Sequence, residues 1–127
     1  MSELGIEQRV NFVGFQRNPY PYMRQAKLLV LSSDIEGLPT VLIESLVLGT
    51  PVVSTDCPSG PREILTGNLS RYLVPPGDID GLARMIKSAL QSPPSIPAEI
   101  LERFDSRKVI ESWIKTIKSR RAAAENN

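Results

Sequence analysis

Short apolar runs of strand length recur along this chain, and segments with helical features separate them. A continuous apolar run bounded by glycine, proline or polar residues favours a strand that is covered on both faces. Such runs occupy residues 10–15, 27–32, 51–54 and 71–74. Gly14 closes the first run, and Pro75 and Pro76 stop the last. We therefore predict about four strands.

Helical spacing or helix-boundary residues mark five further segments. They span residues 19–25, 39–48, 60–66, 78–90 and 106–121. The fourth segment gathers its apolar side chains on one stripe, which consists of Ile79, Leu82, Ala83, Ile86, Ala89 and Leu90. In the fifth segment Trp113 lies on an apolar stripe and is expected in the core. Strands that alternate with helices predict βαβ units and a Rossmann-like parallel sheet with flanking helices.

The loop at residues 33–40 is the first place to look for a ligand, because open sheets of this class bind ligands beyond the carboxyl ends of their strands. This loop leads directly into a helix. Gly37 permits a close backbone approach, and Pro39 at the first helical turn lacks an N–H that would be unpaired there anyway. The N–H groups of Thr40 and Val41 stay free at the positive end of the helix dipole, which suits a diphosphate.

Glu44 is an acidic residue within an otherwise apolar helical segment. Burying such a carboxylate without a partner costs several kcal/mol. It follows Thr40 by one helical turn, about 6 Å along the axis, so a ligand with its phosphate at the helix start could place a ribose near it. The alternative is that Glu44 pairs with a basic residue or a backbone N–H.

The surrounding string carries a family resemblance. Glu36 and Glu44 are separated by seven residues within EGLPTVLIESLVLGTPVVSTD, preceded by RVNFVGF and KLLVLSS and followed by CPSGPREIL and YLVPPGDIDGLARMI. From about residue 5 to residue 90 this order resembles the paired-glutamate signature of retaining glycosyltransferases of family 4. The resemblance implies the C-terminal, donor-binding half of a GT-B fold, and only an incomplete part of it.

The resemblance also implies roles for matching residues. Glu36 would be catalytic and would contact hydroxyls of the donor sugar, and Glu44 would bind the ribose. Backbone groups would meet the sugar and diphosphate at Gly37, Leu38, Pro39, Thr40 and Val41, and the base at Gly14 and Phe15. The loop with Ser59, Gly60 and Arg62 would border the sugar and acceptor; the alternative is a rigid turn with an exposed Arg62.

Composition narrows the chemistry. The chain of 127 residues has a net charge of +1, which gives no argument for nucleic acid, and it has no histidine for a triad, a metal site or a general base. Its one cysteine, Cys57, favours a reducing compartment, so we expect a cytoplasmic protein. No metal or cofactor is implied beyond the substrate, a UDP-sugar or GDP-sugar. The basic residues Lys115, Lys118, Arg120 and Arg121 suit either a solvated face or contact with the inner face of the membrane.

Several parts of the implied enzyme lie outside this sequence. The acceptor-binding N-terminal domain is absent, as are the first strands of the donor domain with their phosphate-binding arginine and lysine. We assign residues 1–127 to a partial donor domain and residues 105–127 to its C-terminal helix and frayed tail. Without the first strands, residues 10–15 lose their neighbour and residues 27–32 expose an edge. We expect these two strands to pair directly, two copies to pair, or another polypeptide to fill the gap.

Three functions stay open at this point. The first is a donor-binding domain that is inactive alone, from an enzyme that transfers a sugar to a hydroxyl with retention in surface polysaccharide or glycolipid synthesis. The second is a non-catalytic module that binds nucleotide sugars. The third is a fragment of a sugar-nucleotide epimerase, which would need acid and base residues from elsewhere.

Overall fold

The computed structural model describes residues 4–125 and has a parallel sheet at its centre. The strands β1 (Leu29–Leu31), β2 (Val52–Thr55) and β3 (Leu73–Val74) lie in the order β1-β2-β3. Both pairings are parallel, with Val30 opposite Val53 and Ser54 opposite Leu73. The predicted α/β class with a parallel sheet is therefore confirmed.

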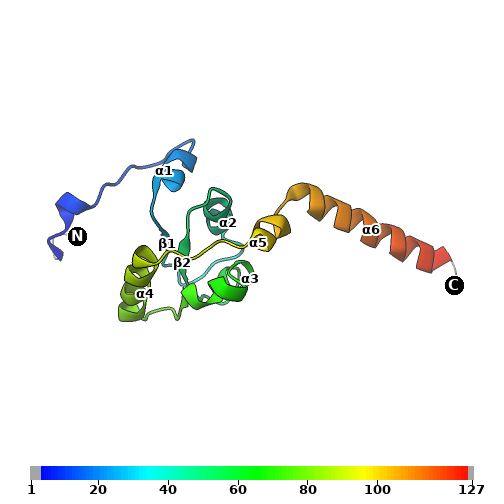
Figure 1. Cartoon of the computed structure of the whole chain (residues 1–127). Helices are drawn as coiled ribbons and strands as arrows, with labels where there is room; N and C mark the ends of the chain where they lie inside the picture. The colour runs from blue at the N-terminus through cyan, green and yellow to red at the C-terminus, as the bar shows by residue number, and fades with distance from the viewer. Residues whose placement is uncertain (1–3, 126–127) are drawn as a thin grey trace.

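Eight helices form within the described residues, and some of them cover the two faces of the sheet (Figure 1). In chain order they are η2 (Glu7–Arg9), α1 (Tyr20–Gln25), α2 (Thr40–Val47), α3 (Pro61–Ile64), η3 (Gly67–Tyr72), α4 (Ile79–Gln91), α5 (Ala98–Arg103) and α6 (Ser106–Glu125). Helix α4 lies on one side of the strands, and α2 and α3 lie on the other (Figure 1). Helix α5 occurs where the sequence analysis predicts none, and the predicted helices otherwise form within a few residues of their expected bounds.

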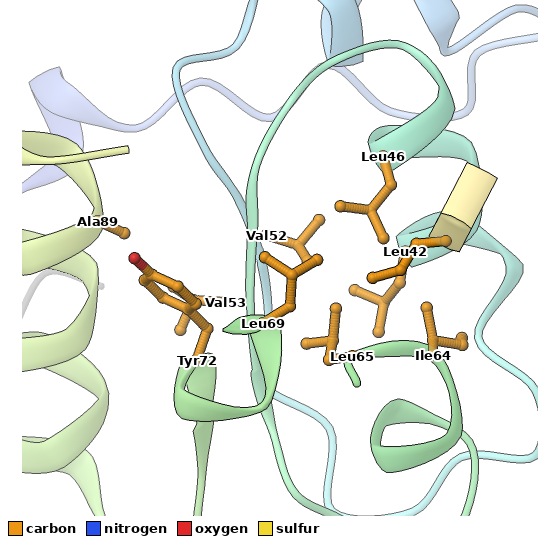
Figure 2. Packing of buried hydrophobic residues seen from close by; sticks show 10 residues of the cluster. Leu42, Leu46, Val52, Val53, Ile64, Leu65, Leu69, Tyr72 and Ala89 are labelled. Carbon is orange, nitrogen blue, oxygen red and sulfur yellow. The ribbon is translucent and has the colours of Figure 1, made fainter. Parts of the chain in front are cut away.

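The core is built around β2, whose four residues are all buried. Successive strand residues point to opposite faces, so neighbouring valines serve different layers. Figure 2 shows Val52 on the side of Leu42 and Leu46, and Val53 beside Tyr72 on the side of Ala89. The side chains of Leu42 and Val53 are fully buried. The buried strand β2 therefore positions the loops that follow β1 and β2 at the carboxyl edge of the sheet.

The predicted strand at residues 10–15 is wrong. This segment is extended but joins no ladder, and Phe12 and Phe15 are 77% and 91% exposed. Within the described residues β1 pairs with β2 alone, so its other edge is open and direct pairing of residues 10–15 with β1 does not occur. The physical reason is that a strand needs a neighbour for its backbone groups, and here that neighbour is missing.

The expected burial of Trp113 is also wrong. Helix α6 extends away from the sheet (Figure 1), and Trp113 is 68% exposed because no described element covers this face. The predicted stripe of α4 holds in part: Ile86 and Leu82 pack on the core together with Met85, whereas Ile79 is 80% exposed at the first turn.

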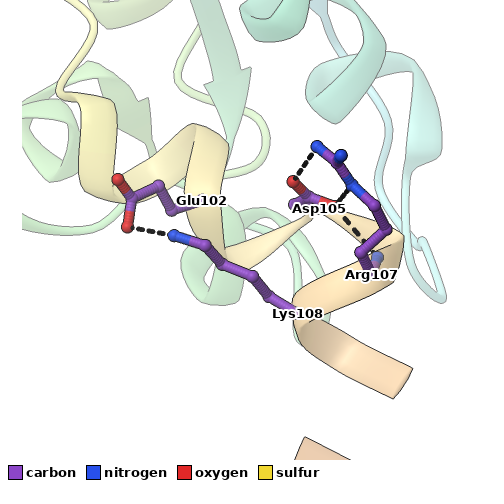
Figure 3. Close-up of polar contacts among 4 residues, drawn as sticks. All are labelled: Glu102, Asp105, Arg107 and Lys108. Atoms are coloured by element: carbon purple, nitrogen blue, oxygen red, sulfur yellow. Dashed lines mark hydrogen bonds and ion pairs between the residues drawn. The ribbon is translucent and has the colours of Figure 1, made fainter. Parts of the chain in front are cut away.

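The start of α6 makes polar contacts with Asp105 in the preceding connection and with Glu102 near the end of α5 (Figure 3). The backbone N–H of Arg107 donates to Asp105 Oδ1 at 2.9 Å, and Lys108 Nζ donates to Glu102 Oε2 at 2.7 Å. The helix continues to Glu125, beyond its predicted end, and residues 126–127 of the expected tail lie outside the described residues. The side chains of Arg120 and Arg121 also lie outside them. Over residues 4–125 no helix combines the length and the apolar character that crossing a bilayer requires.

Candidate functional site

Two loops meet at the carboxyl edge of the sheet, one after β1 and one after β2. Ser59 Oγ in the second loop donates to the backbone carbonyl of Glu36 in the first, at 2.7 Å. Gly60 has a φ of 87°, and a Cβ placed there would lie 2.2 Å from the carbonyl oxygen of Gly37 and 2.4 Å from Cδ of Pro39. Only glycine therefore allows this approach. The structure brings together the two loops that the sequence marks as candidates.

The carboxylate of Glu36 is half-buried and is held by a serine that the sequence analysis missed. Ser33 Oγ donates to Glu36 Oε1 at 2.6 Å. Thr55, at the end of β2 and 5% exposed, donates its hydroxyl to the backbone carbonyl of Ser33. The available signal was the serine three residues before the glutamate, a spacing that allows a local hydrogen bond. No described residue donates a hydrogen bond to Glu36 Oε2.

The N-terminus of α2 has no side-chain cap. The N–H of Leu42 donates to the carbonyl of Pro39 at 3.0 Å, whereas those of Thr40 and Val41 have no acceptor among the described residues. Unpaired N–H groups and the helix dipole together attract an anion. The position is therefore chemically suited to a phosphate group, as the loop sequence predicts.

Glu44 is half-buried on α2, and its carboxylate makes no hydrogen bond or ion pair with any described residue. The alternative in which a basic residue or backbone N–H pairs with Glu44 is therefore not seen. Leu42 and Leu46 form the buried side of the helix, and Glu44 lies one turn beyond the exposed Thr40. A ligand atom at the helix start and a second group near Glu44 could thus be bound along one face.

Arg62 has a partner within its own loop. Its Nε donates to Asp56 Oδ1 at 3.0 Å, and its Nη2 also bonds the same carboxylate. The hydrogen bond from Arg62 holds the pKa of Asp56 below its usual value, with a further contribution from the positive charge. The guanidinium is largely exposed, which matches the alternative of a rigid turn at least for this side chain.

Gly14 and Phe15 lie on the exposed extended segment that precedes α1. Leu38 is exposed and Pro39 is buried under Gly60. The candidates that share one loop and the helix after it are therefore Glu36, the N-terminus of α2 and Glu44, and Ser59 and Gly60 contact the backbone of that loop.

A parallel α/β domain with an acidic loop and an uncapped helix at its carboxyl edge defines a candidate ligand-binding domain of the Rossmann-like class. Comparison with known proteins gives the family. The model of the family described as glycosyl transferases group 1 matches residues 1–123, so the chain belongs to this family.

Its relatives include enzymes of lipopolysaccharide synthesis. The chain is 38% identical over 110 residues to the lipopolysaccharide 1,6-galactosyltransferase of Salmonella typhimurium, covering 80% of this chain and 31% of that protein. It is 37% identical over 86 residues to the lipopolysaccharide core biosynthesis glycosyltransferase LpsE of Rhizobium meliloti, covering 68% of this chain and 25% of the relative.

A solved structure shares the fold. The apo form of the lipopolysaccharide outer core galactosyltransferase WaaB superposes with a TM-score of 0.79 at 31% identity, covering 94% of this chain and 36% of that one. The chain therefore corresponds to part of a GT-B glycosyltransferase. It spans about a third or less of the length of the curated relatives described above.

Proposed function

We propose that this chain binds the donor of a retaining glycosyltransferase of family 4, a nucleoside diphosphate sugar, through Glu36, the N-terminus of α2 and Glu44. The observation that carries the proposal is Glu44, a half-buried residue whose carboxylate has no partner among the described residues, one turn from an uncapped helix start. Its oxygens reach solvent, so they can accept hydrogen bonds from the two hydroxyls of a ribose.

The remaining roles are proposed for the loop at residues 33–40 and the segment before α1. The diphosphate binds the N–H groups of Thr40 and Val41, where the helix dipole stabilises its charge. Glu36 accepts hydrogen bonds from hydroxyls of the donor sugar, and Gly37 and Leu38 present backbone groups to the same sugar. Gly14 and Phe15 border the base when a partner domain or the first donor-domain strands pack on the segment before α1. No metal is required for this binding.

The donor is a hexosyl nucleotide, and UDP-galactose is the first to test. The support is the galactosyltransferase activity named for two of the similar proteins. The complete enzyme transfers its sugar to a hydroxyl of a growing surface polysaccharide or glycolipid, and the chain alone is inactive because the acceptor lies on another domain.

The uncovered surfaces support a partner domain. Residues 10–15 and the apolar stripe of α6 are exposed, with Phe12 at 77% and Trp113 at 68%. Apolar patches of this kind mark contacts with another domain or chain. We assign them to the acceptor-binding domain and the first donor-domain strands, or to a second copy. Lys115 and Lys118 on α6 are exposed and would suit the inner face of a membrane, in a cytoplasmic protein.

Calorimetric titration of the chain with UDP, GDP, UDP-galactose and GDP-mannose tests the proposal. We expect saturable binding of one nucleotide class. Glu44→Ala should weaken it about tenfold or more, since hydrogen bonds to a charged group are lost. Glu111→Ala, which removes an exposed glutamate from α6, is the matched control and should bind like the wild type.

The stability of the same variants separates a functional residue from a structural one. Glu44→Ala should leave the midpoint of thermal unfolding unchanged or raise it, because alanine favours the helix and removes an unpaired charge. The proposal is wrong if no nucleoside diphosphate binds, or if Glu44→Ala binds as tightly as the wild type.

Transfer activity distinguishes an enzyme part from a non-catalytic module or an epimerase part. The chain would replace the matching third of the Salmonella galactosyltransferase, and release of UDP would be followed with and without acceptor. Acceptor-dependent release supports the transferase. Binding without any turnover would favour a non-catalytic module, and interconversion of the free donor would favour an epimerase.

A further inference from the structure

We propose that Ser33 is a positioning residue, whose hydroxyl orients the carboxylate of Glu36 toward the donor sugar. This inference rests on the proposed donor site and adds a residue that the paired-glutamate signature does not include. Ser33 acts through Glu36 and contacts no ligand itself.

The hydrogen bonds around Glu36 form a short chain that begins in the core. Thr55 is 5% exposed at the end of β2, and its hydroxyl donates to the backbone carbonyl of Ser33. Ser33 Oγ in turn donates to Glu36 Oε1 at 2.6 Å. The rigid central strand therefore determines where one oxygen of the carboxylate lies.

The backbone of Glu36 is fixed independently. Ser59 Oγ donates to its carbonyl at 2.7 Å, and Gly60 packs against Gly37 so closely that a Cβ would collide. The backbone of Glu36 is held by Ser59, and its Oε1 is held by Ser33. These two contacts restrict the side-chain torsions of Glu36 before a ligand binds. The other oxygen, Oε2, has no donor among the described residues and is available to a sugar hydroxyl.

Orientation in advance matters energetically for a glutamate. A free glutamate side chain loses rotamer entropy when it is ordered. A binding site that has already ordered the side chain does not lose this entropy on binding. The hydrogen bond from the Ser33 hydroxyl is also stronger than one between neutral groups, because its acceptor is a charged carboxylate. The nucleotide sugar should bind more tightly than the nucleoside diphosphate alone, and we call this gain in affinity the sugar increment. It should therefore depend on Ser33.

A simpler role exists for the same bond, because a serine three residues before a glutamate can brace a loop without any ligand. The two roles differ in which ligand binds more weakly when the Ser33 hydroxyl is removed. Damage to the loop would weaken nucleoside diphosphate and nucleotide sugar alike, since α2 begins in the same loop. Loss of orientation at Glu36 would weaken only the nucleotide sugar.

The experiment compares the affinities of the chain for UDP and UDP-galactose, and for GDP and GDP-mannose, by calorimetry. In Ser33→Ala we expect the affinity for the nucleotide sugar to fall about tenfold or more, the effect of one lost hydrogen bond to a charged group. The affinity for the matching nucleoside diphosphate should stay within about twofold. Ser33→Thr keeps a hydroxyl on Cβ and should therefore retain the sugar increment.

A matched control and a double variant complete the design. Ser70→Ala removes a hydroxyl that also bonds a residue three positions away, the carbonyl of Gly67 at 2.8 Å, and should change neither affinity. Glu36→Ala should lose the same sugar increment as Ser33→Ala, and the double variant should lose no more than Glu36→Ala alone.

The outcomes separate this inference from the proposed site. Equal weakening of both ligands in Ser33→Ala, no weakening at all, or additive losses in the double variant overturn the role of Ser33 while nucleotide binding stands. Equal wild-type affinity for nucleoside diphosphate and nucleotide sugar also overturns it. If the wild type binds no nucleoside diphosphate, both the donor site and the role of Ser33 are rejected.

Discussion

Two apolar runs of similar composition have opposite fates in this molecule. Residues 27–32 contribute β1, which pairs with β2, whereas residues 10–15 stay extended and exposed. Each run has four apolar residues among its six, which is typical of a buried strand. The difference is the neighbour: β2 lies beside residues 29–31, and no strand within residues 4–125 lies beside residues 10–15. An apolar run can therefore form a β-strand, but it does so only where a neighbouring strand is present to pair with it.

The two longest helices differ in the same way, because one packs its apolar side chains on the core and the other leaves them exposed. Helix α4 packs Leu82, Met85 and Ile86 against the core, whereas α6 leaves Trp113 in solvent. We call residues 28–104 the body, and residues 4–18 and 106–125 the arms. The buried apolar core lies in the body, although Ile35, Val47 and Ile79 are exposed there, whereas the large apolar side chains described on the arms are mostly exposed.

The largest expected contrast is in core truncation. Leu42 is fully buried in the body, so Leu42→Ala should lower the free energy of unfolding by about 2–5 kcal/mol. Phe15 on an arm is 91% exposed, so Phe15→Ala should change it by no more than about 0.5 kcal/mol. Urea unfolding followed by circular dichroism measures both. A large loss in Phe15→Ala would show that the arm packs on the body in solution.

The next contrast concerns glycines within the body. Gly60→Ala should cost about 2–4 kcal/mol, because it combines a positive φ with a collision against Gly37 and Pro39. Gly49 has a φ of 83°, but a methyl group added there would meet no atom within 4 Å, so Gly49→Ala isolates the strain at about 1 kcal/mol. Thermal unfolding of the two variants gives the difference. Equal losses would mean that the two loops do not meet as described.

The elements of the body could be predicted from the sequence because local pattern and tertiary packing agree there. The strands at residues 27–32, 51–54 and 71–74 form within their predicted ranges or one residue beyond. The arms could not, since burial of Trp113 depends on a covering surface that no local pattern encodes. Helix α5 was missed because prolines precede it and its apolar residues, Ile100 and Leu101, are too few to show a period.

The site was partly predictable for the same reason. Glu36, Glu44 and the N-terminus of α2 belong to one contiguous string, so the sequence alone places them at the end of a strand. The contacts of Ser59 with Glu36, and of Gly60 with Gly37, join residues 23 positions apart and depend on the packing of two loops. Such contacts become visible only when the fold is known.

A smaller effect is expected on association. The exposed Phe12 and the open edge of β1 should let two copies pair, unless a partner domain covers them. Sedimentation at increasing concentration should show a dimer, and Phe12→Lys should raise its dissociation constant by about tenfold. Thr116→Lys, an exposed position on the other arm, is the control for added charge. A monomer at all concentrations would reject pairing of copies through this edge.

The smallest expected effect is electrostatic and compares an ion pair of the body with one at the start of an arm. Arg62 lowers the pKa of Asp56 below 3.8 in the folded protein, chiefly through a hydrogen bond. A lowered pKa stabilises the folded state above the unfolded value, and this contribution is lost as the pH falls through the folded pKa. Hydrogen exchange of the β2 amides from pH 6 down to about 3 should therefore show a small loss of protection that Arg62→Gln reduces.

The matched pair is Asp105 with Arg107, where hydrogen bonds from Arg107 likewise lower the pKa of Asp105. These residues lie at the start of α6 (Figure 3), so Arg107→Gln should leave the protection of the β2 amides unchanged at every pH. Equal effects of the two variants on β2 would mean that α6 and the sheet unfold as one cooperative unit, and the distinction between body and arm would then hold for burial alone.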